Sequence, residues 1–143
     1  MAATTVNTDV YAARVADPPT ILKGSVIDGR MKRIVCKITP GAVETGSTIN
    51  ICIPPVGARL SSLSKVLFEA FGAGATLAIG IAGETGKFKA AADVAAIGNF
   101  NLDLLAGVDY VFDGVVALIG TTGGATYAAA KALVFEMVFA NFN

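Results

Sequence analysis

Apolar and polar positions alternate with a period of two in several short stretches of the chain, of which residues 31–39, 75–82 and 132–139 are the clearest. A period of two places alternate side chains on opposite faces, as in a β-strand with one face buried. The sequence therefore predicts strands at these three places. In the last of them Glu136 lies on one face, and the other face carries Leu133, Phe135, Met137 and Phe139.

The first strand is followed by a turn signal and a second apolar stretch. Thr39-Pro40-Gly41 suits the centre of a tight turn, and residues 48–53 are rich in isoleucine. The sequence predicts that residues 31–39 and 48–53 form a hairpin. In that pairing Cys36 and Cys52 point to opposite faces and cannot form a disulfide, unless a β-bulge changes the phase of one strand.

Four further segments are less regular. Residues 59–70 fit one face of a helix or one face of a strand, and the all-β surroundings favour the strand. Residues 87–97 suit a short helix or an irregular loop. Residues 121–126, rich in glycine and threonine, suit a loop. Asp113-Gly114 is a hairpin signal between a strand around Val108, Tyr110 and Phe112 and a returning strand at residues 115–119.

Counted together, these segments predict seven or eight short antiparallel strands joined by Gly and Pro turns. This pattern is typical of an all-β jelly roll or β-sandwich. Residues 1–24 lack a clear period, and Pro18-Pro19 stiffens them, so we expect an extended N-terminal arm. The division is therefore an arm at residues 1–24 and a single domain at residues 25–143.

The composition is unusually apolar for one small domain. Apolar residues make up 54% of the 143 residues and charged residues 15%, with a mean hydropathy of +0.65. Ordinary soluble domains have about 25% charged residues. Glycine and threonine interrupt each uncharged stretch, which argues against membrane-spanning helices. The N-terminus lacks the basic and apolar regions of a signal peptide. We therefore expect a chain that buries apolar surface against other chains.

Candidate chemistry is scarce. The chain has no histidine, which excludes Ser-His and Cys-His catalysis, and its two cysteines are too few for a zinc site. The stretch Gly80-Ile-Ala-Gly-Glu-Thr-Gly-Lys-Phe88 resembles a phosphate-binding loop, but Ile81 replaces its first glycine and Phe88 replaces its metal-binding hydroxyl. We interpret it as a turn between strands. Residues Asp93, Asp103, Asp109 and Asp113 read as turn formers, and we expect no enzyme and no cofactor.

A local basic cluster comprises Arg30, Lys32, Arg33 and Lys37, although the formal net charge is zero. It is either a solvated strand face or a surface that docks on an acidic patch of a protein partner. Nucleic acid is not expected, because no aromatic residues are interleaved with the cluster. For partner contacts the sequence favours the arm and this cluster, namely Tyr11, Arg14, Pro18, Pro19, Arg30, Lys32 and Arg33.

Residues 29–126 resemble a family of small head proteins of tailed bacteriophages, the capsid decoration or cement proteins of the small jelly-roll type. The resemblance lies in a basic strand followed by Pro55-Val-Gly-Ala-Arg-Leu60 and by Gly72-Ala-Gly-Ala-Thr-Leu-Ala-Ile-Gly80. The segments Lys87-Phe-Lys-Ala-Ala-Ala-Asp93 and Thr121-Thr-Gly-Gly124 also fit. These motifs are structural, and no catalytic residue belongs to them.

The resemblance implies a homotrimer that is made in the host cytoplasm and attached to major capsid subunits on the outer surface of the virion. It implies no membrane partner. Two other roles stay open from the residues alone. One is a jelly-roll module for carbohydrate or a host surface, with Tyr110 or Tyr127 as the aromatic platform. The other is a different virion component, such as a fibre base or a tail protein.

Overall fold

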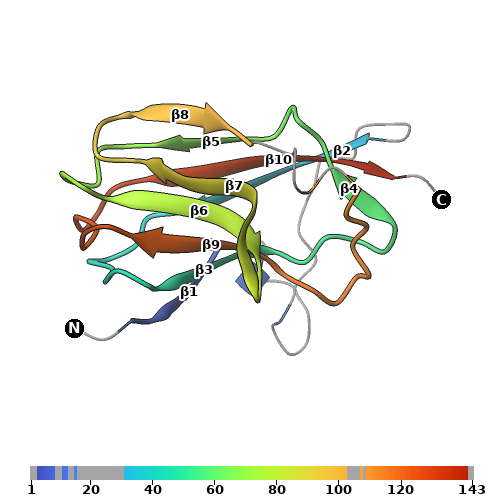
Figure 1. Ribbon diagram of the computed structural model, residues 1–143, viewed down its shortest axis with the longest axis horizontal. Coiled ribbons are helices and arrows are strands. Elements are labelled where there is room, and N and C mark those ends of the chain that lie inside the picture. Colours follow the sequence, from blue (N-terminus) through green and yellow to red (C-terminus); the bar gives the residue numbers. More distant parts are fainter. Residues whose placement is uncertain are drawn as a thin grey trace.

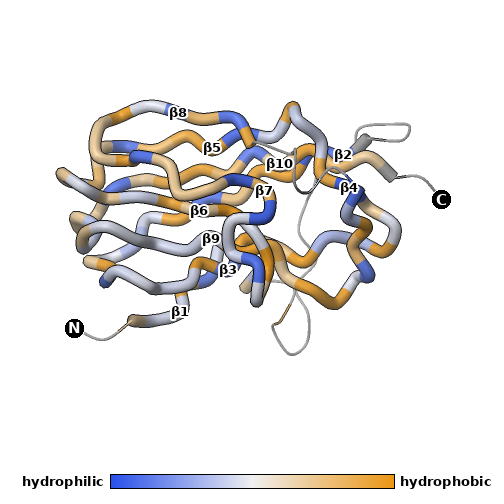
Figure 2. Tube along the Cα trace, in the orientation of Figure 1, coloured by the Kyte–Doolittle hydropathy of each residue, from blue (hydrophilic) through white to orange (hydrophobic). Residues whose placement is uncertain are grey.

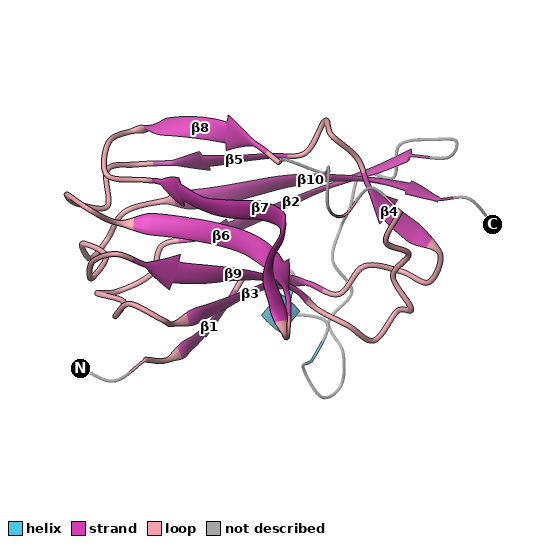
Figure 3. Cartoon of the chain, viewed as in Figure 1, coloured by secondary structure: helices cyan, strands magenta, loops and turns pink. Residues whose placement is uncertain are grey.

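The computed structural model describes residues 3–8, 11–12, 15, 31–102, 107 and 109–141. Within these residues the chain forms ten β-strands in two sheets that pack face to face (Figures 1 and 3). The expected all-β sandwich is confirmed, although the described residues form ten strands instead of seven or eight.

The first sheet has the strand order β1-β3-β9-β6-β7. Its strands are β1 (Thr5–Asn7), β3 (Thr48–Cys52), β9 (Leu118–Gly123), β6 (Thr76–Ile81) and β7 (Glu84–Asp93). β1 runs parallel to β3, and the other neighbours are antiparallel. The fully buried side chains on its inner face include Ile49, Ile51, Leu77, Ile79 and Leu118.

The second sheet has the order β2-β10-β5-β8, and β4 pairs with the end of β10. Its strands are β2 (Met31–Ile38), β10 (Leu133–Asn141), β5 (Lys65–Phe68), β8 (Gly98–Asn101) and β4 (Ala58–Leu60). β10 lies at its centre, and the predicted apolar face of this strand is the buried one. The inner face includes Leu133, Phe135, Met137 and Phe139, all at most 1% exposed.

The predicted hairpin of residues 31–39 and 48–53 is wrong. Both strands exist, but β2 pairs with β10 in the second sheet and β3 pairs with β1 and β9 in the first. The segment after Pro40 crosses between the sheets, where Val43 forms an isolated bridge with Tyr127. The hairpin prediction failed because the true partner of β2 lies about a hundred residues away in the sequence.

Cys52 is buried in the core, and not turned away from Ile49 and Ile51 as the alternation predicted. All three side chains are at most 1% exposed. The pairing of β3 with β9 shifts register between Asn50 and Cys52, so a bulge changes the phase of the strand here. Cys36 is also buried, and both thiols are free.

The less regular segments agree with expectation at one place and differ at the others. Residues 59–70 contain the end of β4 and all of β5, which confirms the strand. Residues 87–93 form most of β7 instead of a helix or loop, residues 94–97 form the irregular link to β8, and residues 121–123 complete β9. The described residues between 109 and 117 contain no strand, so the hairpin at Asp113-Gly114 is wrong. The chain bends there before it enters β9.

The structure places the glycine-rich stretch at residues 80–88 and the first residues of the predicted arm. Gly83, with φ of +85°, lies in the tight turn from β6 to β7, so the stretch that resembles a phosphate loop is a β-turn as interpreted. Gly86 lies within β7.

In the predicted arm, β1 joins the chain's own first sheet, and the Thr8 hydroxyl donates to the Ile51 carbonyl. Most of residues 9–24 lie outside the described residues.

Ser64 fastens the turn before β5 to the edge of β10. Its buried hydroxyl oxygen accepts from the Val138 N–H at 2.8 Å and donates to the Val138 carbonyl at 3.2 Å. Ser64→Ala leaves these buried backbone groups without that partner, so we expect a loss of about 2 kcal/mol in unfolding free energy. Urea denaturation measures the loss. The exposed neighbour Ser62 provides the control, since Ser62→Ala should change stability by less than about 0.5 kcal/mol; equal effects would contradict the assignment.

Candidate interaction surfaces

The outer face of the second sheet carries apolar side chains that no sequence argument singled out. In the strand register, Val134 of β10 lies between Lys37 of β2 and Leu67 of β5. Val35 lies diagonally beside Val134 on β2, and Ile97 precedes β8. The exposed fractions are 44% for Val35, 37% for Leu67 and 78% for Ile97. We call Val35, Val134, Leu67 and Ile97 the apolar stripe.

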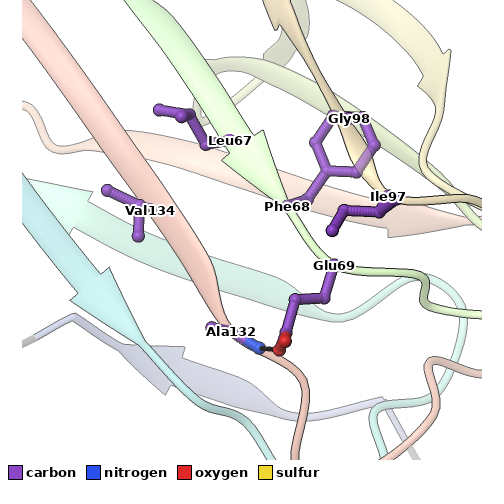
Figure 4. A pocket seen from close by; sticks show the side chains of 7 residues that line it. All are labelled: Leu67, Phe68, Glu69, Ile97, Gly98, Ala132 and Val134. Atoms are coloured by element: carbon purple, nitrogen blue, oxygen red, sulfur yellow. Dashed lines mark hydrogen bonds between the residues drawn. The ribbon is translucent and has the colours of Figure 1, made fainter.

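A shallow hollow of about 240 Å³ lies at one end of the apolar stripe (Figure 4). Its walls are almost entirely apolar, and its one carboxylate, that of Glu69, accepts a hydrogen bond from the Ala132 N–H. With that carboxylate already engaged, the hollow offers shape and apolar contact but no reactive group. The lining residues are Leu67, Phe68, Glu69, Ile97, Gly98, Ala132 and Val134.

Charged side chains of β2 and β10 lie beside the apolar stripe on the same outer face. Arg33 Nε donates to Glu136 Oε1 at 3.0 Å. This hydrogen bond lowers the pKa of Glu136, with a smaller contribution from Lys65, and it raises the pKa of Arg33. Arg33 is exposed and Glu136 is partly exposed, so the pair fixes side-chain orientation more than it stabilises the fold. The outer face thus combines an apolar stripe with an excess of cations.

A second apolar surface lies at the end of the sandwich near β4, where two loops meet. Val56, Val111 and Val115 are 62%, 45% and 78% exposed. Phe112 holds the loops together, because its N–H donates to the Ala58 carbonyl at 2.9 Å and its carbonyl accepts from the Gly57 N–H at 2.8 Å. We call Val56, Val111 and Val115 the valine tip. Figure 2 shows that hydrophobic stretches continue into the loops at this end.

Asp113 stiffens the valine tip. Its Oδ1 accepts from the N–H groups of Val115 and Val116 at 2.9 and 3.0 Å. These backbone hydrogen bonds lower the pKa of Asp113, so the carboxylate stays ionised. At a different turn, after β7, Oδ1 of Asp93 accepts a hydrogen bond from the Ala95 N–H at 2.8 Å. The interpretation of these two aspartates as turn formers is therefore confirmed.

An aromatic cluster supports the valine tip from inside. Phe112 stacks on Phe88 with ring centroids 5.8 Å apart. The rings of Tyr110 and Phe139 stand nearly perpendicular to that of Phe112, with centroids 4.9 and 6.0 Å away. Such pairs fix ring orientation as well as burying area. The tip is therefore a preorganised surface, which lowers the entropy cost of binding.

The residues that the sequence favoured for partner contacts are only partly placed. Arg33 points outward on β2, whereas Lys32 lies opposite the buried Phe139 and is half-buried. Tyr11 is half-buried, and its N–H donates to Thr8 Oγ1 at 3.3 Å. Arg14, Pro18, Pro19 and Arg30 lie outside the described residues. The sequence analysis did not single out Val35. The signal was available, because Val35 is an apolar residue on the otherwise polar face of its strand.

Neither of the two tyrosines considered as a sugar-binding platform is fully exposed. Tyr127 is fully buried, and its O–H donates to the Thr76 carbonyl at 2.6 Å. Tyr110 is half-buried within the aromatic cluster, with Lys87 Nζ 5.1 Å from its ring centre. Across the described ranges, no cluster of three potential metal ligands occurs and no helix is long and apolar enough to cross a bilayer.

The fold is a two-sheet sandwich that also occurs in chains of bacteriophage capsids. A chain in the capsid of Ralstonia phage GP4 superposes with a TM-score of 0.74 at 17% identity, covering 97% of this chain and 99% of that one. A chain in the capsid asymmetric unit of cyanophage Pam1 gives a TM-score of 0.65 at 15% identity, covering 89% and 96%. No family model and no curated protein matches the sequence.

Proposed function

We propose that the chain is a structural virion protein that decorates and stabilises an icosahedral phage capsid. It would attach non-covalently to major capsid subunits on the outer surface, as a homotrimer. The observation that carries the proposal is the shared fold, which spans nearly the whole length of this chain and of two chains from phage capsids. The role needs no bond-making step, and the proposal assigns none.

The exposed apolar surfaces support this role. Burial of apolar area contributes about 25 cal/mol per Å², and part of this offsets the entropy lost on association. The apolar stripe and the valine tip lie on different parts of the sandwich, so one copy can contact more than one neighbour. Repeated around a symmetric shell, such contacts resist separation of the subunits.

The arm and the basic cluster are proposed as the contacts to the shell. Tyr11, Arg14 and Pro18-Pro19 would lie against a neighbouring subunit, and Arg30, Lys32 and Arg33 would face an acidic patch. The outward position of Arg33 supports the second assignment, although Glu136 already shares its charge.

Attachment is tested with capsids that lack the protein. Purified chain is added to such particles, which are then sedimented and heated. We expect saturable co-sedimentation and release of DNA at a higher temperature. Particles that bind no chain at saturating concentration would contradict the proposal.

The arm is tested in the same assay with a double variant, Tyr11→Ala with Arg14→Ala, which leaves β1 intact. We expect about tenfold weaker attachment. The half-exposed Lys131 supplies a control, since Lys131→Ala should attach normally. Unchanged attachment of the double variant would remove the arm from the interface.

A further inference from the structure

The outer edge of β1 is an open strand edge that carries no charge. β1 is the last strand of the first sheet, and the described residues pair it on one side only, with β3 (Figure 1). Thr5 and Asn7 are exposed, and residues 3–8 include no charged side chain and no proline. The register of β1 with β3 has no shift. A regular open edge of this kind accepts a further strand through main-chain hydrogen bonds.

The other three edges of the two sheets are protected. β2 carries Lys32 and Arg33, and β7 carries Lys87 and Lys89 and shifts register twice against β6. At β8, the Lys89 ammonium lies 5.7 Å from the centre of the Phe100 ring. Lysines and bulges at an edge oppose the addition of a strand. Of these four edges, β1 is the one without a charge or a bulge.

Both ends of β1 are fixed to the body of the domain. At its start, the Thr4 N–H donates to the buried Ser47 hydroxyl at 3.0 Å, and the Thr4 carbonyl accepts from the Thr48 N–H at 2.9 Å. At its end, the Thr8 N–H donates to the Asn50 carbonyl at 2.9 Å. A strand that is held in this way loses little further entropy when a partner pairs with it.

Four backbone groups of β1 point away from the sheet. Thr4 and Thr8 direct their main-chain groups to β3. Because the residues of a strand alternate, Val6 also faces β3, whereas Thr5 and Asn7 direct their groups outward. The N–H and C=O groups of Thr5 and Asn7 have no partner among the described residues. They are the hydrogen-bonding groups that a second strand would use.

We propose that β1 pairs with β1 of a second copy, antiparallel, about a two-fold axis at Val6. In this register Thr5 lies opposite Asn7 of the second copy, and the two residues exchange both of their N–H···O bonds. The axis repeats the same pair on its other side. All four outward groups of each copy are therefore satisfied, which makes a second copy of this strand a complete partner for the edge.

The side chains that meet in this register also match. Val6 is half-buried and packs against the core. It faces its own copy across the axis at a position where Cα atoms are about 4.5 Å apart, so the pair buries apolar surface. On the other face, Asn50 Nδ2 donates to Asn7 Oδ1 at 2.8 Å, so the side-chain N–H₂ of Asn7 is left to donate to Thr5 of the second copy.

This contact goes beyond the proposed function. A two-fold contact uses the same patch on both copies and closes with two of them, so it differs from the contact that would form a trimer. It would join copies that belong to neighbouring trimers, and it would turn two five-stranded sheets into one continuous sheet.

Disulfide cross-linking of Val6→Cys tests the register. The two introduced cysteines face each other across the axis within reach of a disulfide. Asn7→Cys is the matched control, because its two copies lie at diagonal positions about 7–8 Å apart, too far for an unstrained disulfide. Oxidation should give at least about tenfold more dimer for Val6→Cys, although Asn7 is the more exposed residue. Gel electrophoresis without reductant measures the dimer, and the wild type, whose thiols are buried, gives the background.

Thr5→Pro tests the edge without cysteines. It removes an outward N–H and leaves the pairing with β3 intact. Sedimentation velocity should show two-fold association at least about tenfold weaker, because each contact loses two hydrogen bonds. The melting temperature should stay unchanged. Thr5→Ser keeps the N–H and should associate as the wild type does.

Equal cross-linking of Val6→Cys and Asn7→Cys would indicate random collision and overturn the proposal. So would a Thr5→Pro chain that associates as the wild type does. If Thr5→Pro weakens only the attachment to capsids, the edge binds a major capsid subunit and the proposal is wrong. The cross-linking uses no capsid, so a positive result combined with failed capsid attachment would refute the proposed function alone.

Discussion

Gly80→Ala is expected to destabilise the fold by about 3 kcal/mol, a large part of the stability of a typical domain. Gly80 lies near the end of β6, which turns directly back into β7 (Figure 1). A Cβ at this position would lie 2.2 Å from the Glu84 carbonyl oxygen and 2.6 Å from the backbone of Thr85. Backbone atoms cannot rotate away as a side chain can, so the two strands must separate. Thermal and urea denaturation measure the loss.

Gly41 gives a matched control for Gly80. A Cβ at Gly41 meets no atom within 4 Å. Gly41→Ala should therefore be neutral or stabilising by up to about 1 kcal/mol, because it reduces the freedom of the unfolded chain. If both alanine variants unfold at the wild-type urea concentration, the close approach of β7 to β6 is wrong.

Tyr127→Ala is expected to cost about 4 kcal/mol. The ring is fully buried and lies 4.6 Å from that of Phe71, centre to centre. Its backbone also bridges Val43 and its O–H bonds Thr76 of β6, so this residue ties the crossing segment to the first sheet. Tyr127→Phe keeps the ring and removes the hydrogen bond to Thr76, and it should cost only about 1 kcal/mol. Equal losses for the two variants would mean that the ring is not a core residue.

The same hydroxyl predicts a loss of stability at high pH. Burial raises the pKa of Tyr127 above its ordinary value of 10.0. The folded state therefore keeps the proton, while the unfolded chain releases it above about pH 10, so stability falls as the pH rises beyond that value. Tyr127→Phe should lose less stability than the wild type between about pH 9 and pH 11. Parallel losses in the two proteins would assign the effect to other groups.

Strands in which apolar and small or polar residues alternate could be predicted from the sequence. β10 and β6 alternate cleanly because one face of each contributes to the core, and this depends little on which strand is the neighbour. The hairpin of residues 31–53 could not be judged in this way. A turn signal at Pro40 fits equally well a tight turn and the start of a crossing between sheets, and only the pairing of β2 with β10 decides between them.

β7 was missed for a different reason. Its residues Ala90, Ala91 and Ala92 favour a helix in isolation, yet tertiary pairing with β6 holds them in a strand. β9 was cut short because Thr121, Thr122 and Gly123 have the composition of a loop. There Thr122 is buried, and its hydroxyl donates to the Glu44 carbonyl at 2.8 Å, which requires contacts the sequence does not show.

The candidate surfaces were predictable only in part. The basic residues of β2 stood out as a cluster, and Arg33 does point outward. Val35 was hidden within the same strand, and part of the valine tip was assigned to a hairpin. Val56 and Val111 lie on separate loops, and they become one surface only because the buried Phe112 joins those loops.

The central claim is that this chain is a structural part of a phage capsid. Cryo-electron microscopy of the assembled virion, combined with mass spectrometry of its proteins, tests this most directly. The account predicts density for the two-sheet sandwich on the outer surface, at repeated positions that bridge major capsid subunits. A virion whose proteins do not include the chain, or that carries it only in the tail, would contradict the account.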